Sequence, residues 1–185
     1  MKKIVLTFGL IAGAILSAMM LATLPFMDVI GFDRGEIIGY TSMLVAFLLI
    51  FFGVKSFRDN VAGGSVTFGR ALGVGVLIAL VASACYVATW QVIYYKLAPD
   101  FGAKYQAHVL EEARADGETE AQLAERKAEL ERFMALYKNP VINVGITFLE
   151  PLPVALVVAL VSAGVLSRRR REGLLANSRV SPGTI

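Results

Sequence analysis

Four long apolar runs set the strongest limit on what this chain can fold into. They cover residues 4–27, 37–54, 71–95 and 141–166. Each is close to or above the about 18–20 residues that a helix needs to cross a hydrocarbon core about 30 Å thick. Within lipid such runs must form helices, because an open strand edge would leave backbone N–H and C=O groups unpaired. The sequence therefore predicts an all-α protein, a four-transmembrane-helix bundle.

The first run has a second interpretation, as a signal peptide, because Lys2 and Lys3 precede it. It continues to Met27, however, which is longer than the about 7–15 residues of a usual signal-peptide core. We therefore expect it to be retained as the first membrane span. Residues 1–168 then form a single four-span membrane domain, followed by a basic, disordered tail over 169–185.

Basic residues are distributed unequally between the two sides that these spans define. The N-terminus, the loop around residues 55–70 and the C-terminal tail are basic, whereas the opposite side carries most of the acidic residues. The positive-inside rule therefore predicts that both termini lie in the cytoplasm. At the start of the tail, a run of arginines is interpreted as an anchor that could also attract anionic lipid headgroups. The run consists of Arg168, Arg169, Arg170 and Arg171.

Residues 98–140 form the longest segment between spans, on the outer side, and they predict a short extramembrane helical hairpin between the third and fourth spans. Asp116-Gly117 is a turn signal. Thr119 and Gln122 have the spacing of a capping box that starts a second helix. That helix carries an apolar stripe, which we expect to pack on the first helix and the bundle, with partner binding as the alternative. The stripe consists of Leu123, Leu130, Phe133, Met134 and Tyr137.

The fourth run carries a carboxylate followed by two prolines, Glu150, Pro151 and Pro153. Counted from Pro140 at about 1.5 Å per residue, Glu150 lies about 15 Å into the membrane. A charged carboxylate at such depth costs at least about 2.5 kcal/mol. The prolines lack N–H groups, so the helix should break there, which is tolerated only inside protein or beside a cavity. We therefore predict an intramembrane polar site at this break. By depth, its further candidates are Tyr86, Gln91, Ser17 and Ser42.

Signals for other chemistry are lacking in the sequence. It shows no Ser-His-Asp set, no paired catalytic carboxylates, no Cys-X-X-Cys pair and no phosphate-binding glycine loop. His108 has no second His or Cys nearby, which argues against a metal site. We therefore expect a protein that is not an enzyme and has no cofactor, no metal and no nucleic-acid partner.

Small residues recur at helical spacing in three spans, as at Gly9, Gly13 and Ser17 in the first. Such faces let helices approach closely. We expect them to serve packing within the chain, with homo-oligomerisation through one of them as the alternative.

Several short stretches match one family in order and spacing. They are "GEIIGYTSM" (35–43), "TFGRALGVG" (67–75), "YVATWQVIYYKLAPDF" (86–101), "YKNP" (137–140) and "FLEPLPVAL" (148–156). With them the chain resembles a bacterial membrane protein family catalogued as domain of unknown function 4199, from about residue 4 to residue 168. The resemblance implies a four-span inner-membrane protein of a Gram-negative bacterium and adds no activity.

Two functions follow from these patterns. The first is a non-enzymatic structural or partner-binding protein of the bacterial inner membrane. The alternative is a small proton- or cation-coupled transporter or channel subunit that uses Glu150 at the broken fourth helix. The sequence identifies neither a substrate nor a partner, nor an oligomeric state.

Overall fold

The computed structural model describes the backbone of residues 1–180 and the side chains of residues 1–167. In that part of the chain every regular element is a helix. In order they are α1 (Lys2–Thr23), a 3₁₀ turn η1 (Leu24–Phe26), α2 (Met27–Ile30), α3 (Phe32–Asn60), α4 (Phe68–Val92), a π-helical turn η2 (Ile93–Leu97), α5 (Phe101–Ala115), α6 (Glu120–Tyr137), α7 (Pro140–Leu149) and α8 (Leu152–Val180).

Within the described part of the chain, four stretches of helix are long and apolar enough to cross a membrane. They are Lys2–Ile30, Phe32–Asn60, Phe68–Leu97 and Pro140–Ser167. Each contains one of the predicted apolar runs, so the predicted four-helix class is confirmed. Their outward surfaces carry large exposed apolar side chains, which lipid accommodates at no cost.

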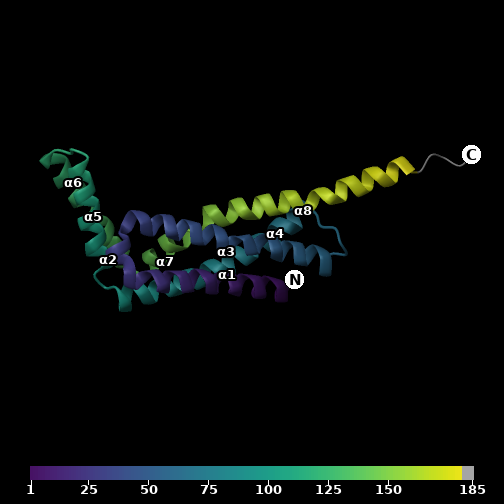
Figure 1. Cartoon of the computed structure of the whole chain (residues 1–185), viewed down its shortest axis with the longest axis horizontal. Coiled ribbons are helices and arrows are strands. Elements are labelled where there is room, and N and C mark those ends of the chain that lie inside the picture. Colours follow the sequence, from purple (N-terminus) through teal and green to yellow (C-terminus); the bar gives the residue numbers. More distant parts are fainter. Residues whose placement is uncertain (181–185) are drawn as a thin grey trace, which may run out of the picture.

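The long helices lie side by side, with α4 packed against α1, α3 and α8. Figure 1 shows the α5–α6 hairpin at one end of this bundle and the N-terminus at the other, where α8 runs out beyond its neighbours. We call these ends the hairpin end and the terminal end. The two ends of the described chain therefore leave the bundle in the same direction.

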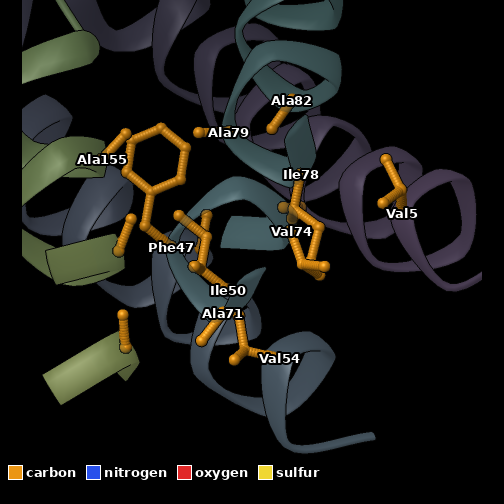
Figure 2. Packing of buried hydrophobic residues seen from close by; sticks show 14 of the residues in the cluster. Val5, Phe47, Ile50, Val54, Ala71, Val74, Ile78, Ala79, Ala82 and Ala155 are labelled. Carbon is orange, nitrogen blue, oxygen red and sulfur yellow. The ribbon is translucent and has the colours of Figure 1, made fainter. Parts of the chain in front are cut away.

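Small residues allow α8 to approach α3 and α4 closely. The ring of Phe47 on α3 lies between Ala79 on α4 and Ala155 on α8, and all three are buried (Figure 2). Ala155 and Ala159 recur at a spacing of four residues along α8, so they form one face of that helix. A Cβ atom placed on Gly75 would lie 3.1 Å from the Cβ of Ala159. The core is thus built by close helix approach around a few large side chains.

The small-residue face of α1 is occupied by α4. A Cβ atom on Gly9 would lie 2.6 Å from the Cβ of Val81, and one on Gly13 would lie 2.5 Å from the Cβ of Cys85. This face therefore serves packing within the chain. Gly39, by contrast, has open space where a side chain would begin.

The hairpin forms between α5 and α6 as predicted. Both hydrogen bonds of the capping box are present at the start of α6: the Thr119 side chain accepts from the Gln122 N–H, and the Gln122 side chain accepts from the Thr119 N–H. In the apolar stripe of α6, Leu123 and Met134 are buried, and Met134 lies against Gly102 of α5.

Aromatic rings dock α5 on the start of α3. The ring of Phe32 packs against those of Phe101, Tyr105 and His108. His108 Nε2 also lies 3.0 Å from Oδ1 of Asp33. Rings gathered at the end of a membrane bundle are typical of the interface with water, where they fit both environments.

At the other end α8 is longer than the sequence suggested. The backbone stays helical over residues 169–180, where we expected a disordered tail. A helix that has already formed extends without a new nucleation cost, and Arg, Glu, Leu and Ala favour its continuation. The expectation for residues 181–185, and the lipid contact suggested for the side chains of Arg168, Arg169, Arg170 and Arg171, lie outside the described residues.

Candidate functional site

The fourth span is interrupted at the predicted position. α7 ends at Leu149 and α8 begins at Leu152, with Glu150 and Pro151 forming a turn between them. Pro153 lies in the first turn of α8, where a backbone N–H would have no partner in the helix, so it fits without strain. Pro151 is therefore the proline that separates the two helices, and Glu150 lies on the C-terminal end of α7.

The face of α7 that packs on α4 is polar. Asn143, Thr147 and Glu150 follow each other at the spacing of one helix face. Gln91 of α4 donates from Nε2 to Oδ1 of Asn143 at 2.7 Å, and Thr147 Oγ1 donates to the same oxygen at 3.4 Å. The Nδ2 of Asn143 donates to the backbone carbonyl of Tyr137 at 3.3 Å. The Asn143 side chain is fully buried, so these bonds satisfy an amide that water does not reach.

Tyr137 connects this polar face to the hairpin. Its hydroxyl oxygen accepts from Nε1 of Trp90 at 2.9 Å and lies 3.1 Å from Oγ1 of Thr147. Burial raises the pKa of the Tyr137 hydroxyl above its ordinary value, which further favours the protonated form. We call the connected set the α4–α7 network. It consists of Trp90, Gln91, Tyr137, Asn143 and Thr147.

Glu150 lies beyond this network, one turn further toward the membrane centre. The hydroxyl of Tyr86, on α4, donates toward its carboxyl group. Glu36 of α3 lies close enough to repel the carboxyl group electrostatically, and Tyr40 of α3 acts on Tyr86 in the same way. The Tyr86 side chain is buried, whereas that of Glu150 is exposed on the outside of the bundle. We call this set of four residues the Glu150 face.

The structure therefore brings only some of the candidate residues together. Tyr86 contacts Glu150, and Gln91 belongs to the adjoining network. Ser17 instead accepts from Oγ1 of Thr89 at 2.7 Å across the α1–α4 interface, and Ser42 donates to a carbonyl oxygen of its own helix at 2.7 Å. Both serines had been included for their depth alone. Each serine lies at a position around its own helix axis that points its side chain away from Glu150.

Several residues of the site were missed in the sequence. Asn143 and Thr147 are the main ones, although their spacing from Glu150 in an apolar run was a usable signal. Trp90 and Tyr137 belong to segments that only the fold brings together, and Glu36 comes from the start of α3. Among the described residues, no group of three or more His, Cys, Asp or Glu side chains is placed to hold a metal ion.

Four apolar helices, with a polar network between α4, α6 and α7, define the class, a helical-bundle integral membrane protein. Within it, the chain belongs to the family described as protein of unknown function (DUF4199), whose model matches residues 7–168. The match covers most of the first candidate span, the other three spans and the hairpin, which confirms the resemblance seen in the sequence. No curated protein and no solved structure matches the chain.

Proposed function

We propose that this chain is a non-enzymatic protein of the inner membrane, with both termini in the cytoplasm, that binds another transmembrane helix at the Glu150 face. The supporting observation is the exposure of Glu150 on the outside of the bundle, within the span of Pro140–Ser167. Tyr86 approaches only one side of this carboxyl group, and the side that faces hydrocarbon has no hydrogen-bond partner there, which is unfavourable even when the group is neutral. A partner helix that brings a polar side chain to Glu150 removes this cost.

The surroundings of Glu150 suit a helix as the bound element. Leu149, beside Glu150, is 64% exposed, and Tyr40 on α3 is 45% exposed. Gly39 precedes Tyr40 and has open space around it, so the backbone of a partner could approach α3 closely. α3 packs along α1, α4 and α8, while α7 packs against α4 and α6. Glu36 and Tyr40 of α3 lie near Glu150 and Tyr86, so side chains of α3 contribute to the surface at the end of α7.

Crosslinking in native membranes tests this function. A photoreactive amino acid at Leu149 should capture a protein, whereas one at Val161 should not. Val161 is equally outward-facing, at 59% exposed, and lies on α8 away from the acid. A product of twice the chain's mass identifies a second copy, and any other mass identifies a different membrane protein. Equal capture from both positions, or capture from neither, contradicts the proposal.

A proton- or cation-coupled transporter or channel subunit is the second candidate, and the location of Glu150 at the C-terminal end of α7 favours it. That end of a helix carries partial negative charge, and Glu36 adds a second carboxylate nearby. Broken transmembrane helices bind coupling ions at such ends in known transporter folds. Four spans without an internal repeat are few for a carrier, which is why this function comes second.

One substitution separates the two functions. Glu150→Gln keeps a hydrogen-bonding side chain of the same size but can neither release a proton nor attract a cation. If Glu150 binds a partner helix, the crosslinked product formed from position 149 is still seen in the Glu150→Gln variant. It is lost in the Glu150→Leu variant. If Glu150 carries a proton or cation, Glu150→Gln abolishes a pH- or Na⁺-driven flux in liposomes. Glu111→Gln, on α5, serves as the control for the loss of a charge alone, because Glu111 lies outside the Glu150 face.

A further inference from the structure

A second site lies at the terminal end of the bundle, far from Glu150 along the helices. There a cavity of about 210 Å³ opens between α3 and α8. Its α3 side presents one helix face, because Phe51, Lys55 and Arg58 are spaced by four and three residues. Val165 and Leu166 form the α8 side. The cavity thus combines apolar walls with two cationic side chains.

Charge in this cavity is only partly balanced by the residues whose side chains the structure describes. The guanidinium group of Arg58 is buried and donates from Nε to Oδ1 of Asp59 at 2.6 Å. Its two terminal nitrogens make no hydrogen bond to the described residues. Lys55 is exposed and forms no ion pair within that same part of the chain. Among the described side chains, Lys55 and Arg58 thus bring two positive charges against the one negative charge of Asp59, and Arg58 presents a guanidinium fork that an oxyanion would complete.

We propose that this cavity binds the phosphate group of an anionic phospholipid. Its depth matches the boundary between hydrocarbon and headgroups, since Lys55 follows the last apolar residue of the second span. The phosphate would lie on Lys55 and Arg58, with the glycerol and the first methylene groups against Phe51 and Val165. The cavity is smaller than the about 300–1,000 Å³ usual for whole small molecules, which suits a headgroup whose chains remain in the bilayer.

A free phosphate ion shares the charge chemistry but leaves the apolar walls without a contact. This difference is the reason for assigning the site to a lipid. Basic pockets between transmembrane helices on the cytoplasmic side are a recognised form of headgroup site. The chain also passes from Leu166 at the cavity into the arginine-rich stretch 168–171, which adds positive charge to this end of the sequence.

Native mass spectrometry of the purified full-length protein, titrated with phosphatidylglycerol or phosphatidylcholine, tests the proposal. Phosphatidylglycerol should bind preferentially. Lys55→Gln should lower its apparent affinity about fivefold, the contribution expected of one cationic side chain near anionic lipid. Val165→Trp should also weaken binding, because it fills the cavity without changing its charge. Phosphatidylcholine binding should be unchanged in both variants.

Lys3→Gln is the matched control, since it removes the same charge at the same end of the bundle but outside the cavity. It should leave phosphatidylglycerol binding intact. Equal losses from Lys3→Gln and Lys55→Gln would mean diffuse attraction and overturn the site. Unchanged binding in Val165→Trp would do the same. Displacement of the lipid by inorganic phosphate would assign the cavity to a soluble phosphate and overturn the lipid assignment.

Discussion

Asn143 forms hydrogen bonds in two directions within the membrane-spanning part of the chain. Its Oδ1 accepts from Gln91, and its Nδ2 donates to the backbone carbonyl of Tyr137. Without the Asn143 amide, the Gln91 side chain and the backbone carbonyl of Tyr137 each lose a hydrogen bond inside the bundle. A buried polar group left unpaired costs about 1–3 kcal/mol in water-soluble proteins. Hydrogen bonds between transmembrane helices average about 0.6 kcal/mol, because the alternative partners also lie in the membrane.

We expect Asn143→Leu to lower the free energy of unfolding by about 1–2 kcal/mol, between these two limits. The measurement is unfolding by sodium dodecyl sulfate in mixed micelles, followed by circular dichroism. Val144→Leu is the control, since Val144 adjoins Asn143 on the outward side of α7. Combining Gln91→Leu with Asn143→Leu should cost less than the sum of the single changes, because the two side chains share one hydrogen bond. Additive losses would show that Gln91 and Asn143 act independently.

The depth of each candidate residue in the membrane could be predicted from the sequence, but the direction in which its side chain points could not. A helix rises by a fixed length per residue, so counting from Pro140 placed Glu150 and Tyr86 at comparable levels. Which way a side chain points depends on how each helix is rotated against its neighbours. Small residues set that rotation: Gly9 and Gly13 turn one face of α1 to α4, and Ser17 turns with them to Thr89. The sequence shows these residues without showing which helix they meet.

At the scale of elements, the contact of α1 with α4 depends on the absence of a side chain. A methyl group on Gly13 would begin 2.5 Å from the Cβ of Cys85, closer than two carbon atoms approach without displacement. The neighbouring atom is a Cβ fixed to the backbone of α4, so the helices themselves would have to separate. Such overpacking typically costs about 1–3 kcal/mol.

We therefore expect Gly13→Ala to reduce stability by about 1–3 kcal/mol, measured by the same detergent unfolding. Gly39→Ala is the matched control, because the same methyl group meets open space there. In a helix interior that change should be neutral or stabilise by up to about 1 kcal/mol, since alanine loses less conformational freedom than glycine. If Gly13→Ala is as well tolerated as Gly39→Ala, the α1–α4 interface is looser than described.

Element boundaries followed the sequence where local chemistry decides them. Thr119 and Gln122 start α6 through side-chain bonds to the backbone, and Pro151 divides the fourth span because proline cannot donate an N–H. The helical backbone of residues 169–180 depends on a different cause. Composition indicates whether residues 169–180 favour water, but a polar, helix-favouring segment attached to an existing helix can continue it in water.

For the whole molecule, the arrangement of charge and the arrangement of helices agree. The basic N-terminus and the basic loop after α3 lie at the terminal end, and the acidic hairpin lies at the other (Figure 1). Since the basic segments share one end, the positive-inside rule predicts one orientation in the membrane, with the hairpin outside the cytoplasm. Phe32 and its ring contacts hold the hairpin close to that surface.

This orientation predicts which engineered cysteines a membrane-impermeant maleimide reaches in intact cells. Asp116→Cys, in the hairpin turn, should react in intact cells after removal of the outer permeability barrier. Val61→Cys, in the loop after α3, should react only after the inner membrane is opened. Both positions are exposed, so access and not burial decides the result. The native Cys85 lies mid-span, packed against Gly13, and the unmodified chain should give no signal under either condition. The reverse pattern would place the termini outside, and labelling of both variants in intact cells would mean that the chain inserts in two orientations.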